Sequence, residues 1–97
     1  MLNTPDKNMN KFVLWGEYCE NALKKREPFR EEHLSRLQTL KEAGILITLG
    51  PTKCNTFVFG IFEAESIDYV RNILEEDIYW KNGIWTSLEV YQWVQAF

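Results

Sequence analysis

The chain has 97 residues, which is the size of one domain, and 45% of them are hydrophobic, so it can bury a core and disorder is not expected. Its formal net charge is −3, and the charges are mixed along the chain, which argues against a nucleic-acid partner. No run approaches the ~20 apolar residues that a membrane span needs, so no membrane partner is expected.

The start of the chain is polar and has no apolar run typical of a signal peptide. We expect 1–10 to be a flexible N-terminus and 11–97 to form a single domain. Cys19 and Cys54 fit no metal-ligand spacing, so they are expected to be reduced thiols without a chemical role in a cytoplasmic protein.

The first half of the chain predicts a strand and then a helix. Residues 11–19 are rich in aromatic and aliphatic side chains and predict the strand. A polar loop with room for a helical turn follows at 20–27. Pro28 suits the first turn of a helix that should run to about Ala43, with Gly44 just past its end.

The second half predicts two strands, at 45–49 and 56–64, followed by a helix at 67–76. A compact connection at 77–85 then leads to the last strand at 86–94. Gly50 and Pro51 break the first of these strands. Ser66 is a good N-cap, and Asp68 is favourable in the first turn of the helix. The order is β-α-β-β-α-β, so we predict a ferredoxin-like α+β fold, with one antiparallel sheet and both helices on one face.

Two predicted strands are apolar on both faces. Residues 57–62 do not alternate with polar side chains, and the first strand places Phe12 and Leu14 on one face and Val13 and Trp15 on the other. Because two helices cover only one face, we expect a homodimer packed sheet against sheet. The alternative is a monomer with an unusually aromatic surface.

The one histidine of the chain, His33, falls inside the apolar arc of the first predicted helix, next to Leu37. Arg30 lies one turn earlier and within the same arc. A buried imidazole needs partners for its two ring nitrogens. It is either a structural core histidine bonded to a backbone carbonyl, or part of a pocket that Arg30 also enters.

Asp77 falls on the apolar side of the second predicted helix if that helix persists so far. The helix dipole and desolvation both disfavour an acid there, so a partner is expected, either His33 or Arg30. The alternative is that Asp77 caps the turn at 78–80. A His–Asp pair is a proton-transfer unit, because the carboxylate fixes the tautomer while the other ring nitrogen exchanges a proton.

Four aromatic residues can form a wall for a small planar ligand, or belong to the core or a dimer interface: Tyr79, Trp80, Trp85 and Trp93. The chain has no nucleophile-elbow serine and no glycine-rich phosphate loop. A lone histidine without an acid cluster predicts no metal, and no cofactor is expected.

Several short motifs, in order, resemble the YciI-like (YCII-related) family. Residues 30–34, Arg-Glu-Glu-His-Leu, resemble its R-x-x-H-L, and 77–79, Asp-Ile-Tyr, resemble its D-P-Y. Further matches along 11–97 are Ala43-Gly44, the strand ending at Gly50-Pro51, Glu63-Ala64-Glu65-Ser66, Gly83, Glu89-Val90 and Trp93.

This resemblance implies a dimeric α+β barrel and a pocket with a His–Asp pair, which carries over to His33 and Asp77. Chloride elimination from a chlorinated hydroxyquinol is one activity known in the family, and muconolactone isomerases are structural relatives. Ile78 replaces the usual proline, and residues 54–56 lack a glycine often found in that hairpin, so the pocket rim departs from the family pattern.

The leading hypothesis is a cofactor-free lyase or isomerase that transfers a proton on a small enolisable or aromatic metabolite. His33 is the expected general acid/base, Asp77 its orienting partner, and Arg30 the binder of an anionic oxygen. Further residues expected in the substrate site are Gly50, Pro51, Tyr79 and Trp93. The alternatives are a non-catalytic ligand-binding or regulatory dimer, and a cofactor-independent oxygenase.

Overall fold

The structure is a computed structural model that describes residues 9–97, so 1–8 of the expected flexible terminus lie outside the described residues. Its elements are β1 (Asn10–Tyr18), α1 (Ala22–Lys25), α2 (Glu27–Glu42), β2 (Leu46–Pro51), β3 (Phe57–Ala64), α3 (Ile67–Glu75), α4 (Ile78–Lys81) and β4 (Trp85–Trp93). The long elements follow the predicted order, and each predicted boundary lies within two residues of the observed one. Within 9–97 no helix is long and apolar enough to cross a membrane.

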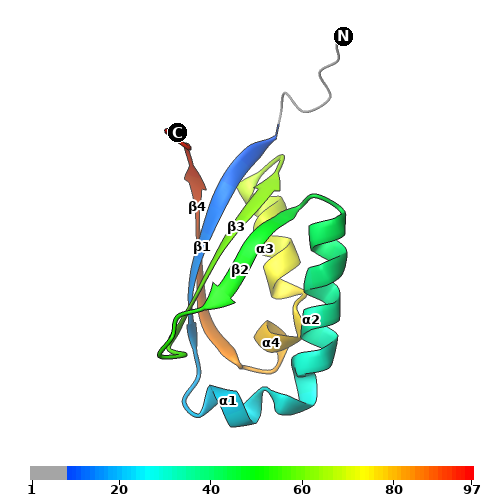
Figure 1. Ribbon diagram of the computed structural model, residues 1–97, viewed down its shortest axis with the longest axis vertical. Coiled ribbons are helices and arrows are strands. Elements are labelled where there is room, and N and C mark those ends of the chain that lie inside the picture. The colour runs from blue at the N-terminus through cyan, green and yellow to red at the C-terminus, as the bar shows by residue number, and fades with distance from the viewer. Residues whose placement is uncertain (1–8) are drawn as a thin grey trace.

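The four strands form one antiparallel sheet in the order β2-β3-β1-β4. The long helices pack against one face of it, with α2 over β2 and α3 over β3 and β4 (Figure 1). The predicted ferredoxin-like α+β fold is therefore confirmed. The single-turn helices α1 and α4 lie at the same end of the sheet as the start of α2, and α4 contacts α2 (Figure 1).

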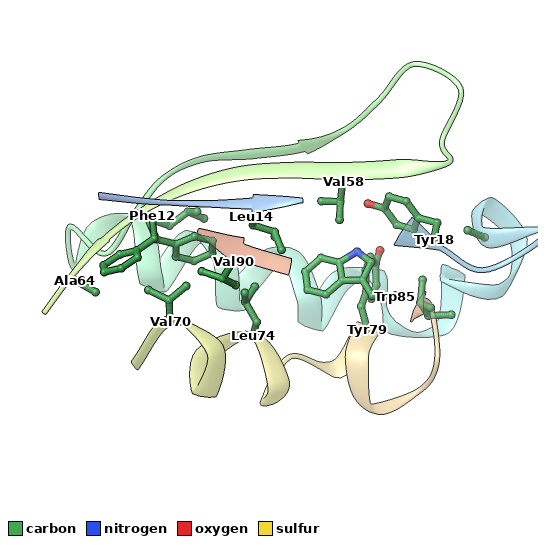
Figure 2. Close-up of a cluster of buried hydrophobic side chains, with 14 residues drawn as sticks. Phe12, Leu14, Tyr18, Val58, Ala64, Val70, Leu74, Tyr79, Trp85 and Val90 are labelled. Carbon is green, nitrogen blue, oxygen red and sulfur yellow. The ribbon is translucent and has the colours of Figure 1, made fainter. Parts of the chain in front are cut away.

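The core lies between the sheet and the helices. Alternate residues of β1 and β3 face it, including Phe12, Leu14 and Val58, and α3 contributes Val70 and Leu74 (Figure 2). His33 is the one fully buried residue of α2 along Glu27–Glu42, all of which the structure describes, and Phe29, Leu37 and Leu40 pack against the core half-buried. The most deeply buried side chain of α2 is thus a polar one.

An irregularity between β1 and β4 shapes the end of the core where α1 and α4 lie. Glu17 pairs with Ser87, but Tyr18 pairs with Trp85, so the register skips Thr86. The extra residue keeps Tyr18 and Trp85 together on the helix-covered face. Just before it, a Cβ on Gly16 would lie 2.6 Å from the carbonyl oxygen of Ser87, so this close approach requires glycine.

The opposite face of the sheet carries exposed apolar side chains. Trp15 and Phe59 remain 39% and 41% exposed there, and Trp15 stacks on Phe57 with ring centroids 4.9 Å apart. Ile47 and Tyr91 are also exposed. The two-faced apolar pattern predicted from the sequence is present, and no helix of the described chain covers this outer face.

Candidate functional site

His33 lies in the second turn of α2 and is only 3% exposed. The helix starts as predicted, with a proline in its first turn. Phe29 and Leu37, one turn away on either side, are half-buried and pack against the core. The helix periodicity therefore carries His33 into the sheet-facing side, as the apolar arc predicted.

Asp77 lies between α3 and α4 and is 1% exposed. Its backbone is extended, because α3 has already ended at Glu75. The Asp77 Oδ1 atom accepts a hydrogen bond of 2.8 Å from the backbone N–H of Tyr79, which makes it the N-cap of α4. The capping role considered from the sequence is therefore present.

His33 and Asp77 also meet directly, with Nδ1 2.8 Å from Oδ1. The sequence posed capping of the turn and pairing with His33 as alternatives, and one carboxylate does both. An ionised carboxylate only accepts hydrogen bonds, so Nδ1 carries a proton and donates it, which leaves Nε2 as the basic nitrogen. No hydrogen bond to Nε2 is recorded among residues 9–97.

Arg36 completes the charge balance around Asp77, and the sequence reasoning missed it. Its Nη1 lies 3.6 Å from Oδ2 of Asp77, while Oδ1 serves His33 and the α4 cap. Arg36 lies one turn after His33, whereas the predicted Arg30 lies one turn before it. The i, i+3 spacing makes Arg36 a candidate beside Arg30 but does not choose between them. Because the Arg36 side chain is 30% exposed, its contact with Asp77 contributes less than a fully buried pair would.

Aromatic rings hold the imidazole on two sides. Tyr79 stacks on His33 with ring centroids 3.6 Å apart and planes 9° apart. Trp85 meets His33 edge-on at 5.2 Å. Burial raises the pKa of the Tyr79 phenol, so this ring stays neutral beside the histidine at neutral pH. The packing leaves His33 little freedom to rotate.

His33 lines a cavity of about 110 Å³ between the start of α2 and the end of β2. The predicted site residues Arg30, Gly50, Pro51 and Tyr79 line the same cavity. Its other lining residues are Tyr18, Arg26, Leu34, Leu37 and Leu49. A groove of about 280 Å³ shares those three leucines, so the cavity opens along the seam between α2 and β2.

Two of the four predicted aromatic-wall residues lie elsewhere. Trp93, predicted as a substrate-binding residue, is at the far end of β4, where it pairs with Lys11, and it does not line this cavity. Trp80 lines a separate, smaller cavity against α3 and β4. The register of β4 gives the reason, because it places Trp85 beside Tyr18 and Trp93 at the opposite end of β1.

Tyr18 also lines a larger cavity, of about 350 Å³, with Cys19 and Cys54 at its border. Both cysteines are free thiols. We place the candidate site in the smaller cavity, because His33 lines it and is paired with the buried Asp77 in a geometry that suits proton transfer. Over residues 9–97 no group of three or more His, Cys, Asp or Glu side chains is arranged to hold a metal ion.

The arrangement can exchange a proton with a bound molecule. The carboxylate holds Nδ1–H and supports the positive charge that forms on the ring when Nε2 is protonated. The ring borders the cavity, and Arg30 adds a positive charge at the same border. These are the parts of an acid–base site for a small anion.

Comparison with known proteins adds a family and two informative structures. The model of the YCII-related domain matches residues 10–94. The 5-chloro-2-hydroxyhydroquinone dehydrochlorinase of Burkholderia phenoliruptrix AC1100, in complex with 2,5-dihydroxybenzoquinone, is 27% identical, with a TM-score of 0.76 over 89% of this chain and 95% of that one. A NIPSNAP family protein from Agrobacterium tumefaciens is 16% identical, with a TM-score of 0.57 over 98% and 92%, and shows the shared fold. No curated protein matches the chain significantly.

Cys54 generates a prediction about thiol reactivity. Hydrogen bonding, chiefly from the Thr52 hydroxyl 3.3 Å away, lowers the pKa of this exposed thiol from 9.0 to about 7. In a Cys19→Ser background, alkylation by iodoacetamide should therefore rise through a midpoint near pH 7, since the thiolate is the reactive form. Thr52→Val should move that midpoint upward. An unchanged midpoint in Thr52→Val would show that the hydroxyl does not lower the pKa.

Proposed function

Since the chain belongs to the YCII-related domain family, we propose that it is a small-molecule enzyme with His33 as general acid/base and Asp77 as its orienting partner. The observation that carries this proposal is the buried 2.8 Å contact between Nδ1 and Oδ1, made by a ring that also borders a cavity. The reaction is a proton transfer of the lyase or isomerase type on a small enolisable or aromatic metabolite, and these side chains suffice for it.

The proposed cycle begins with Nε2 of His33 as the base. Nε2 removes a proton from a carbon or oxygen of the substrate, and the electron pair left behind moves into the substrate's conjugated system. Asp77 stabilises the imidazolium through Nδ1–H. In an isomerisation the proton returns to a different atom of the substrate. In an elimination the electron pair expels a leaving group, and the imidazolium then loses its proton to solvent.

Arg30 is proposed to bind the oxygen that gains negative charge as the proton leaves. The similar dehydrochlorinase supports an aromatic substrate class, because its name gives a chlorinated hydroxyhydroquinone as the compound it acts on. Gly50 and Pro51 line the cavity from the end of β2, where a flat ligand would contact backbone instead of bulky side chains. A non-catalytic ligand-binding dimer remains the competing function, and turnover separates the two.

We propose that two copies of the chain associate through the outer face of the sheet. Trp15, Phe59 and Ile47 leave that face apolar, and the helices lie on the opposite side. In such a dimer each copy covers the same apolar patch of the other, as an isologous interface requires. The cytoplasm is the proposed compartment, because Cys19 and Cys54 are free thiols and a reducing environment keeps them so.

The dyad generates a prediction for two variants. His33→Gln should reduce kcat by at least ~10²-fold, because it removes the proton acceptor. Asp77→Asn should lower kcat more than it weakens ligand binding, since an asparagine oxygen can still cap α4 while the charge that supports the imidazolium is gone. Steady-state kinetics on a substrate found by screening hydroxylated and chlorinated hydroquinones and enolisable acids would measure both.

The matched control is Asp68→Asn, which makes the same chemical change at an exposed position in the first turn of α3. Its kcat should equal that of the wild type. A folded His33→Gln variant with wild-type turnover would refute the acid/base role.

The outer face generates a prediction about assembly. Sedimentation equilibrium at micromolar concentration should give twice the 11.5 kDa chain mass. Phe59→Glu should give a monomer, because it places a charge in the centre of the apolar patch. Leu23→Glu, at a 50% exposed position on α1, should leave the dimer intact. A wild-type protein that sediments only at the chain mass would rule out the dimer.

A further inference from the structure

Cys19 and Cys54 border one cavity of about 350 Å³. Cys19 directly follows β1, whereas Cys54 is in the turn between β2 and β3, so the two residues are far apart along the chain. Both are free thiols. Figure 1 shows this turn beside the connection from β1 to α1. The fold therefore brings the two cysteines of the chain to one place.

The antiparallel pairing of β1 with β3 accounts for this proximity. It continues beyond the start of β3, where the backbone N–H of Tyr18 donates to the carbonyl oxygen of Thr56 at 2.8 Å. Continued by one residue, this register sets Cys19 opposite Asn55, the immediate neighbour of Cys54. In regular antiparallel geometry, a residue and the neighbour of its partner have Cα atoms about 6 Å apart, and a disulfide spans about 4.4–6.8 Å. The register thus favours a bridge that a small shift of the turn can form.

The two thiols differ in exposure and support. Cys19 is half-buried against the core, and its backbone N–H donates to the carbonyl oxygen of Ile84 at 2.8 Å. Cys54 is exposed, and the hydroxyl of Thr52 lies 3.3 Å from its sulfur. That hydrogen bond is the chief cause that lowers the pKa of Cys54 to about 7, so about half of this thiol is ionised at neutral pH. Cys54 is therefore placed to react first with an oxidant in solution, and Cys19 to react second from a fixed position.

We infer that Cys19 and Cys54 are a redox-active pair, which a hydroperoxide oxidises to a disulfide within one chain and which a dithiol reduces again. This inference goes beyond the proposed acid/base function and does not depend on the turnover of any substrate. It replaces the expectation from the sequence that neither thiol has a chemical role. That expectation used the spacing of the cysteines along the chain, whereas strand pairing sets their distance in the fold.

The oxidation takes two steps. The Cys54 thiolate attacks one oxygen of the peroxide, so that an S–O bond forms, the O–O bond breaks and the other oxygen takes up a proton and leaves as water. The Cys19 sulfur then attacks the sulfur of the resulting sulfenic acid, so that an S–S bond forms, the S–O bond breaks and a second water leaves with the thiol proton. Two thiols and one hydrogen peroxide thus give one disulfide and two waters, and the peroxide accepts the two electrons.

The thiol pair adjoins the candidate site. Tyr18 lines both the thiol cavity and the cavity of His33. Gly50 and Pro51 line the His33 cavity and lead directly into the turn that carries Cys54. In the reducing compartment proposed above, the dithiol is the resting form and the disulfide forms when an oxidant appears. The bridge, once formed, constrains a segment that leads to the wall of the site.

The test treats the reduced full chain with hydrogen peroxide at pH 7 and then blocks the remaining thiols with N-ethylmaleimide. Intact-mass spectrometry should show wild-type chains that have lost two hydrogen atoms and taken up no maleimide. Peptide mapping without reductant should find Cys19 linked to Cys54, and non-reducing electrophoresis should show the mass of one chain. Dithiothreitol should restore two thiols that maleimide labels.

Substitutions assign the order of the two steps. Cys19→Ser should stop at the sulfenic acid, which dimedone traps on Cys54. Cys54→Ser should react with peroxide at least ~10-fold more slowly, because it lacks the exposed thiolate. Thr52→Val should slow disulfide formation at pH 7 about 3-fold or more, since less of Cys54 is then ionised. The matched control is Thr39→Val, at an exposed threonine on α2, which should leave the rate unchanged.

Three results would overturn the inference: a disulfide that links two chains with none inside a chain, a wild-type Cys54 driven to sulfinic acid while Cys19 still takes up maleimide, or two free thiols after millimolar peroxide. A folded Cys54→Ser variant whose Cys19 reacts with peroxide at the wild-type rate would contradict the assigned order. Thermal unfolding confirms that each variant is folded, and the wild-type measurement needs no substitution.

Discussion

The carboxylate of Asp77 is buried at 1% exposure, and a buried charge is tolerated only when its neighbours satisfy it. Three groups do so from two parts of the chain: His33 and Arg36 from α2, and the backbone N–H of Tyr79 at the start of α4. These contacts join the first βαβ half of the fold to the second. Together with the core packing of Phe29, Leu37 and Leu40, this contact positions α2 on the sheet.

The hydrogen bond that satisfies Asp77 also prepares His33 for proton transfer. An acceptor on Nδ1 fixes which nitrogen is free, and stacking on Tyr79 with the edge of Trp85 alongside limits how the ring turns. Burial of the His33–Asp77 pair costs desolvation free energy, so hydrophobic residues of similar volume could stabilise the fold equally well at these two positions. Its place at a cavity wall explains why a polar pair is useful there. The sheet then has two roles, with the site on its helix-covered face and an apolar surface for assembly on the other.

Much of this could be predicted from the sequence, because the fold depends on local patterns. Apolar runs and breakers located every long element, and the helical period placed His33 on the sheet-facing side. Asp77 was identified by its position on the apolar side of a helix, although it lies beyond the end of α3 and caps α4. The desolvation argument for a partner applies at the observed position, whereas the helix-dipole argument does not, because a negative charge is favourable at the N-terminal end of α4.

The rest depends on tertiary geometry. Arg30 and Arg36 are each one turn from His33, and only the position of Asp77 decides which of them reaches the carboxylate. Trp93 was grouped with the site on composition and family motif, whereas the strand register separates it from Trp85 by the length of β4.

The tautomer of His33 tests the central claim most directly, and the measurement is unambiguous because the chain has one histidine. Two-dimensional ¹⁵N–¹H NMR of the imidazole, recorded on the ligand-free protein at a pH where the ring is neutral, distinguishes the two nitrogens. The account predicts a proton on Nδ1, donated to Asp77, and a bare Nε2 facing the cavity. Asp77→Asn should weaken that preference. A neutral ring with its proton on Nε2 would contradict the account, because Asp77 would then be the donor and His33 would have no basic nitrogen for the substrate.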